Sequence, residues 1–112
     1  MNWLEIVSLE LQRGEEARRK GNDGRARTSA RRAAGSAITE LEKGFPEKHY
    51  GSDFMSQLRS FVRDPDVDQS VRDAAERLQA RLSTDFESPS KDPIGDARII
   101  IAFVVERLAQ LL

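Results

Sequence analysis

The sequence predicts an all-α protein: an up-and-down bundle of about five helices, folded as a single domain over residues 1–112. Three observations predict this class. Apolar residues recur three and four positions apart in five segments, which is the spacing of one helix face. Glycine, asparagine, aspartate and proline interrupt that pattern between the segments. A chain of 112 residues is long enough to bury one core and too short to bury two.

The first two helices are expected to form a long antiparallel hairpin. The first runs from Trp3 to about Gly21, with one apolar face made of Leu4, Val7, Leu11 and Gly14 and widened by Trp3, Ile6 and Leu9. In the turn at 21–24, Asn22 or Asp23 can cap the next helix by accepting from its free N–H groups. That helix runs from about Asp23 to Lys43, and its apolar face is made of Ala26, Ala30, Ala33, Ala34, Ala37, Ile38 and Leu41. Most of these side chains are methyl groups, so a neighbouring helix can approach closely, and the short turn makes that neighbour antiparallel.

Two shorter helices are expected after the hairpin. Gly44, Phe45 and Pro46 end the second helix, because glycine tolerates the left-handed C-terminal conformation and proline cannot continue the hydrogen-bond ladder. The third helix follows a cap at Ser52 or Asp53, ends at Asp64-Pro65, and turns inward Phe54, Met55, Leu58, Phe61 and Val62. The fourth opens at Asp66 or Asp68, with a narrow apolar stripe of Val67, Val71, Ala74, Ala75, Leu78 and Leu82. A loop is expected from Ser83 to Pro93, in which Asp92 can cap the next helix and Pro93 suits its first turn.

The last helix, from Ile94 to near Leu112, is apolar around nearly its whole circumference, through Ile99, Ile100, Ile101, Phe103, Val104 and Val105. The β-branched residues would also suit a strand over 98–105, but no second segment is available to pair with it. A bundle of this size does not easily cover so wide an apolar surface. We therefore expect a homodimer.

The charge of the chain is unevenly distributed. The net charge is −1, but residues 18–32 hold seven bases and one acid. This segment and the glycine-rich turn before the second helix predict an anion or nucleotide site formed by Arg18, Arg25, Arg27, Arg31 and Arg32. A solvated turn and a polar helix face are the alternative interpretation. No cysteine is present, the longest apolar run is seven residues, and the N-terminus lacks the pattern of a signal peptide, so we expect a cytoplasmic protein with no membrane segment.

No complete set of catalytic or metal-ligating residues is apparent. His49 is the only histidine, and no nucleophile motif lies near it. Asp64, Asp66 and Asp68 have the spacing of the first ligands of a calcium loop, but Gln69 and Ala75 stand where that loop requires glycine and glutamate. We therefore expect no metal and no cofactor.

Two segments resemble the HEPN domain family. The segment from Lys20 to Ile38 is similar to the region that joins the first two helices of HEPN domains, and the segment from Pro93 to Leu108 is similar to their final helix. The resemblance implies an up-and-down bundle, often dimeric, found in prokaryotes beside or fused to small nucleotidyltransferases and in toxin–antitoxin pairs.

Some HEPN proteins are RNases that use an arginine followed, after four to six residues, by a histidine. This chain departs from that motif, because the positions that follow Arg98 at this spacing hold Phe103, Val104 and Val105. We therefore expect a non-catalytic HEPN-like protein, a partner of a nucleotidyltransferase or a nucleotide-binding module. The alternatives are an RNase and a protein that binds the backbone of nucleic acids.

Overall fold

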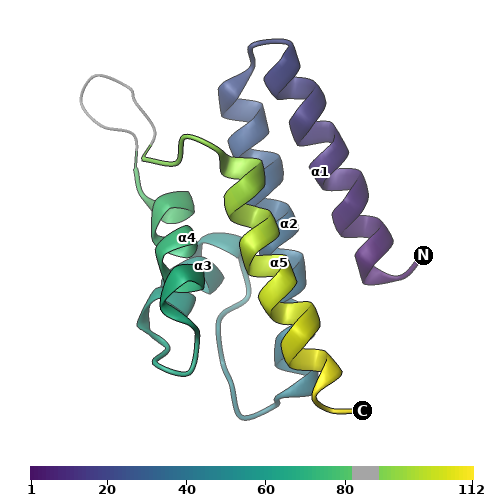
Figure 1. The fold of residues 1–112 in the computed structure, drawn as a ribbon, viewed down its shortest axis with the longest axis vertical. Coiled ribbons are helices and arrows are strands. Elements are labelled where there is room, and N and C mark those ends of the chain that lie inside the picture. Colours follow the sequence, from purple (N-terminus) through teal and green to yellow (C-terminus); the bar gives the residue numbers. More distant parts are fainter. Residues whose placement is uncertain (82–88) are drawn as a thin grey trace.

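A computed structural model describes residues 1–81 and 89–112, and the described part contains five helices and no strand (Figure 1). Their bounds are α1 Trp3–Arg19, α2 Asp23–Gly44, α3 Phe54–Arg63, α4 Gln69–Gln79 and α5 Pro93–Ala109. The predicted all-α class and the order of the elements are confirmed. Leu82, expected in the stripe of the fourth helix, and most of the expected loop from Ser83 to Pro93 lie outside the described residues.

Helices α1 and α2 form the predicted long antiparallel pair (Figure 1). The turn between them depends on Gly21, whose φ of 77° lies in the left-handed region that glycine adopts without strain. The N–H of Asn22 then donates to the carbonyl of Ala17 at 2.8 Å, and its side chain accepts from the N–H of Arg25 at 3.1 Å. Asn22, rather than Asp23, is therefore the cap of α2.

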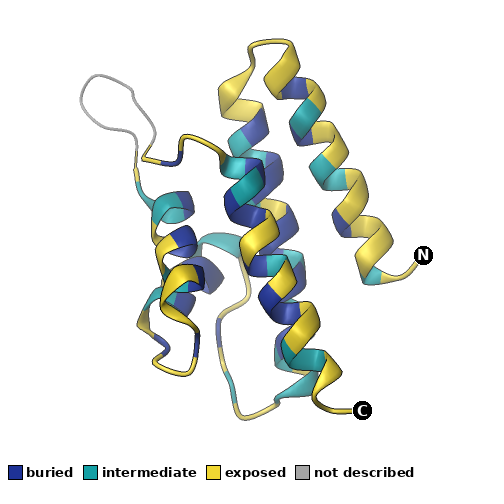
Figure 2. Ribbon diagram, in the orientation of Figure 1, coloured by how far each residue is buried: buried dark blue, intermediate teal, exposed yellow. Residues whose placement is uncertain are grey.

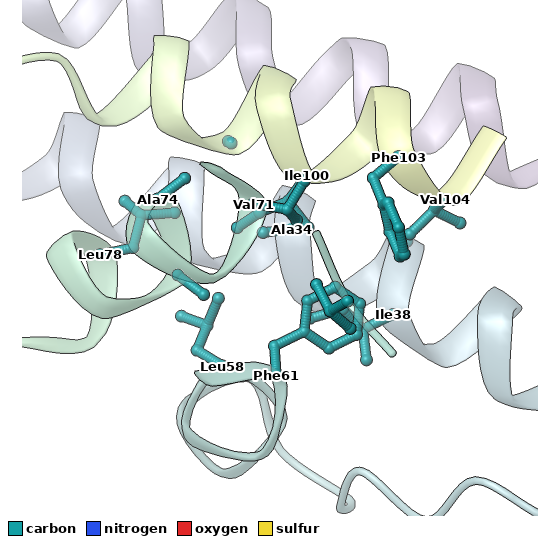
Figure 3. Packing of buried hydrophobic residues seen from close by; sticks show 14 of the residues in the cluster. Ala34, Ile38, Leu58, Phe61, Val71, Ala74, Leu78, Ile100, Phe103 and Val104 are labelled. Carbon is teal, nitrogen blue, oxygen red and sulfur yellow. The ribbon is translucent and has the colours of Figure 1, made fainter. Parts of the chain in front are cut away.

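Helix α5 lies along α2 and runs parallel to it. The short helices α3 and α4 pack against these two helices on the side away from α1 (Figure 1). The core lies where α2, α3, α4 and α5 meet, and Figure 3 shows its side chains converging from all four. Its largest fully buried members are Phe61, Ile38, Leu58, Leu78, Ile94 and Ile100.

The caps expected at the starts of α3 and α5 are present, whereas the side chain of Asp68, at the start of α4, makes no capping hydrogen bond. Asp53 caps α3 by accepting from the N–H of Ser56 at 2.9 Å, and Asp92 caps α5 by accepting from Gly95 at 3.0 Å. Gly44 does not take the left-handed conformation that the sequence predicted, because α2 runs through it. A Cβ there would stand 2.7 Å from a methyl carbon of Leu108, so Gly44 instead allows the end of α5 to lie close to α2.

The predicted inward face of α1 is only partly correct. Val7, Gly14 and Ala17 are buried, but Leu4, Ile6 and Leu9 are exposed. Helix α1 packs on α2 along its length and contacts α5 only briefly, so a single narrow face of α1 is covered (Figure 2). Within the described residues, no helix is long and apolar enough to cross a membrane.

The contrast between two glycines of α2 gives a test of the packing. A Cβ at Gly35 would lie 2.6 Å from the Cβ and 3.1 Å from the Cα of Phe54 in α3, so Gly35→Ala forces the two helices apart. We expect it to lower the free energy of unfolding, measured by urea denaturation, by about 1–3 kcal/mol. Gly24→Ala is the matched control, because nothing lies within 3.9 Å of its Cβ position; this change is expected to stabilise the protein by about 0.5–1 kcal/mol. Equal stability of the two variants would contradict the packing described.

Candidate functional site: a basic groove between α1 and α2

A groove of about 790 Å³ runs between α1 and α2 near the turn that joins them. Arg13 of α1 and Lys20, the residue after α1, line one side, and Arg25, Thr28, Ser29 and Arg32 line the other side from α2. The residues on each wall are three or four positions apart along their helix, or a multiple of that spacing, which places them on one face. We call this feature the hairpin groove.

The acids of the hairpin groove already have basic partners. Glu10 pairs with Arg13 at 3.6 Å, and Glu16 pairs with Lys20 at 3.0 Å. The hydrogen bond from Lys20 lowers the pKa of Glu16, so this carboxylate stays ionised and paired.

The guanidinium groups of Arg25 and Arg32 make no hydrogen bond or ion pair within residues 1–81 and 89–112. The groove therefore holds four bases and two acids, and the surplus positive charge lies on α2.

The other three arginines of the predicted anion site lie elsewhere. Arg18 donates to Asp92 at 2.6 Å and so joins α1 to the start of α5. Arg31 donates to the carbonyls of Leu78 and Ala80 at 2.6 and 3.3 Å, where it satisfies the open C-terminal end of α4. Burial lowers the pKa of Arg31. Arg27 is half-buried and does not line the groove. The structure thus brings together Arg25 and Arg32 out of the five predicted residues.

The predicted contribution of the helix N-terminus is reduced by its cap. The N–H of Arg25 donates to the side chain of Asn22, and the N–H of Ala26 donates to the Asn22 carbonyl. These two donors are satisfied within the protein, so they are not available to an anion in the groove.

Arg13 and Lys20 were not among the predicted site residues. They are seven positions apart, with Ala17 between them, and so fall on the same face of α1. Helical spacing alone could have found this wall of the groove. Which α2 residues it faces depends on how the two helices are rotated against each other.

A second cluster of charged groups surrounds Asp64, which is buried. Its carboxylate accepts from the Tyr50 hydroxyl at 2.6 Å, from the Lys48 ammonium at 3.0 Å and from the Asp66 N–H at 2.9 Å. Burial alone would raise the pKa of Asp64, but these hydrogen bonds outweigh it and lower the pKa. Burial, and then the bond to Asp64, raise the pKa of Tyr50 far above its ordinary range.

The Asp64 cluster is a structural junction. Lys48 also binds Asp66 at 2.8 Å, and Arg107 of α5 donates to the Asp66 carbonyl at 3.1 Å while covering the ring of Phe103. The cluster thus ties the α2–α3 connection and the α3–α4 turn to α5. The cavity beside it is about 20 Å³, the size of one water molecule.

Two of the aspartates with calcium-loop spacing, Asp64 and Asp66, bind the Lys48 ammonium, and Asp68 precedes α4. Among the described residues, no group of three or more acids or histidines is placed to hold a metal ion. His49 is exposed in the connection between α2 and α3, whereas Arg98 of α5 donates to Glu15 of α1.

Comparison of the chain with protein-family models, with curated proteins and with solved structures gave no match. The chemistry of the hairpin groove is therefore the basis for a functional proposal.

Asp64 predicts a loss of stability in acid. Because its pKa in the folded protein is lowered, its contribution is present above the ordinary aspartate pKa of about 4 and disappears as the pH falls through the lower folded value. We expect Asp64→Asn to lower the free energy of unfolding at pH 7 by about 1–3 kcal/mol. The difference from the unchanged protein should shrink at pH 3, as measured by urea denaturation.

Asp66→Asn is the control for this experiment. It removes another carboxylate that binds Lys48, but that carboxylate is exposed, so the expected loss is below about 1 kcal/mol. If Asp64→Asn lowers the free energy of unfolding as much at pH 3 as at pH 7, the charge of Asp64 is not what stabilises the junction.

Proposed function

We propose that the hairpin groove binds the phosphate groups of a nucleotide, and that the protein is a non-catalytic, HEPN-like nucleotide-binding protein. The observation that carries this proposal is the pair of guanidinium groups, Arg25 and Arg32, that share one wall of a groove and form no ion pair among the described residues. Arginine binds phosphate oxygens with two parallel N–H donors, and such charge-assisted bonds are stronger than neutral ones.

The spacing of the two arginines suits a polyphosphate. Arg32 follows Arg25 by seven positions, which is about 10 Å along the helix axis. Both side chains are long and exposed, so they can bend toward two phosphates of one ligand or toward its two ends. Across the groove, Lys20 is paired with Glu16 and Arg13 with Glu10, so the attraction for an anion comes from the two arginines of α2.

The HEPN resemblance supplies the proposed biological setting. The five-helix order, the long α1–α2 pair and the final helix against α2 support this resemblance. We propose that the partner is a nucleotidyltransferase and that the two proteins form a toxin–antitoxin pair. A groove that binds nucleotides is consistent with a partner enzyme whose substrates are nucleotides. A gene adjacent to a nucleotidyltransferase reading frame would support this setting, and an isolated gene would count against it.

Binding to a nucleic-acid backbone is the second candidate, and the exposed position of both arginines is the observation in its favour. The two candidates differ in their salt dependence. A protein that contacts many phosphates along a strand releases many counterions, so its affinity falls steeply with salt, whereas one nucleotide engages only a few charges.

Removing both arginines tests the proposal. We expect a fluorescent ATP analogue to bind the unchanged protein and to bind Arg25→Ala/Arg32→Ala at least about tenfold more weakly, because each lost charge-assisted bond contributes about 1.5–3 kcal/mol in favourable geometry. Fluorescence anisotropy at 50 and 200 mM KCl measures both the affinity and its salt dependence. A fluorescent single-stranded RNA is titrated in parallel.

The matched control is Arg59→Ala/Arg63→Ala, which removes the same charge from exposed positions of α3, outside the groove. It should leave nucleotide binding unchanged. If both double variants bind the ATP analogue equally weakly, the loss of affinity would come from the change in net charge and not from the groove. Tighter binding of RNA than of nucleotide, with a steep salt dependence, would favour the second candidate.

A further inference from the structure

The outer face of α5 has no partner in the described chain. In Figure 2 this helix carries buried and exposed positions in alternation along its length. Ile99 and Val105, both large and apolar, are 39% and 42% exposed. The exposed face contains, in order, Arg98, Ile99, Ala102, Val105, Glu106 and Ala109. It is separate from the hairpin groove, so a role for this face is independent of nucleotide binding.

This face has an internal symmetry. Measured from Ala102, Ile99 lies three positions before and Val105 three positions after. Arg98 lies four positions before and Glu106 four positions after, so opposite charges stand about 6 Å from Ala102 in the two directions along the axis. Turning the helix end to end about Ala102 therefore exchanges the positions of Ile99 and Val105, which are both apolar, and those of Arg98 and Glu106, which have opposite charges.

We propose that α5 packs antiparallel against α5 of a second copy, about a twofold axis that passes between the two Ala102 residues. This arrangement brings Arg98 of each copy level with Glu106 of the other, and Ile99 level with Val105. The same patch serves both copies, as a twofold interface requires. The methyl side chain at the centre allows the two helix axes to approach to about 10 Å, which leaves the two Cα atoms of residue 102 about 5 Å apart.

The charges specify a second copy in this orientation. Glu106 makes no hydrogen bond or ion pair within residues 1–81 and 89–112, and the dimer gives it a basic partner. Arg98 donates to Glu15 within its own chain, and its remaining donors are available at the edge of the face. A parallel pair would instead set Arg98 beside Arg98 and Glu106 beside Glu106, which like-charge repulsion disfavours.

The absence of cysteine in the chain allows a direct test by cross-linking. A disulfide forms only when the two Cα atoms lie within about 7 Å. Residue 102 meets its own copy at the twofold axis, so Ala102→Cys should yield mostly disulfide-linked dimer on a non-reducing gel after mild oxidation. Ser70→Cys, at an exposed position of α4, is the control and should stay monomeric. Equal cross-linking of the two variants would overturn the proposal.

The register is tested by two further positions. The two copies of residue 99 stand about 9 Å apart along the axis, as do the two copies of residue 105. Ile99→Cys and Val105→Cys should therefore cross-link poorly alone, whereas the double variant Ile99→Cys/Val105→Cys should cross-link well. Stronger cross-linking by either single variant than by Ala102→Cys would overturn the position of the axis.

The charge pairs are tested in solution by sedimentation velocity from 1 to 200 µM. The unchanged protein should show a concentration-dependent dimer. Glu106→Arg should weaken the dimer at least tenfold, because both charge pairs of the interface then set arginine beside arginine. Arg98→Glu/Glu106→Arg should restore the affinity to within about threefold of the unchanged protein. Circular dichroism verifies that each variant is folded. A monomeric unchanged protein over this range, or a charge-reversed double variant as weak as Glu106→Arg, would contradict the proposal.

Discussion

The structure depends on the close approach of other helices to α2. This helix packs closely against α1, α3, α4 and α5, while each of the other helices packs closely against at most three. Its buried face consists largely of alanine, with Gly35 at the place where α3 crosses. Methyl groups and hydrogen atoms leave short distances between helix axes, so four neighbours fit around one helix of 22 residues. Larger side chains on α2 would push these neighbours apart.

The close packing on the alanine face also determines where the arginines of α2 lie around the helix. Because the buried face is filled by alanine, charged residues are confined to its two edges and its outer side. Arg25 and Arg32 fall on the edge beside α1, where their charges meet the hairpin groove. Arg31 falls on the other edge and satisfies carbonyls at the end of α4. One dense run of positive charge in the sequence is therefore divided in the fold between the groove wall and the end of another helix.

Helix α5, in contrast, carries more apolar side chains than the neighbouring helices bury. Ile100, Phe103 and Val104 are buried in the core that α5 shares with α2, α3 and α4 (Figure 3). The remaining apolar residues, Ile99 and Val105, stay at the surface because α1 lies to one side and reaches α5 only at Glu15 and nearby positions. The wide apolar circumference that the sequence predicted is real, but the five helices leave part of it uncovered.

Local chemistry in the sequence determined the helices themselves. Apolar spacing, the caps at Asn22, Asp53 and Asp92, and the stop at Asp64-Pro65 act within a few residues, so they can be read without knowing the fold. The antiparallel α1–α2 pair also followed, because a turn of three residues leaves little alternative. These features account for the fold class and for the presence of a basic surface near the hairpin.

The tertiary structure alone decided which side chains act together. Arg18 finds its partner Asp92 74 positions away, and Arg31 finds Leu78 47 positions away, so neither could be removed from the predicted anion site by inspecting its neighbours in the sequence. The exposure of Leu4 likewise depends on where α5 lies relative to α1. Periodicity places a residue on a face of its own helix, but the surroundings of that face are set by elements that only the folded chain brings near.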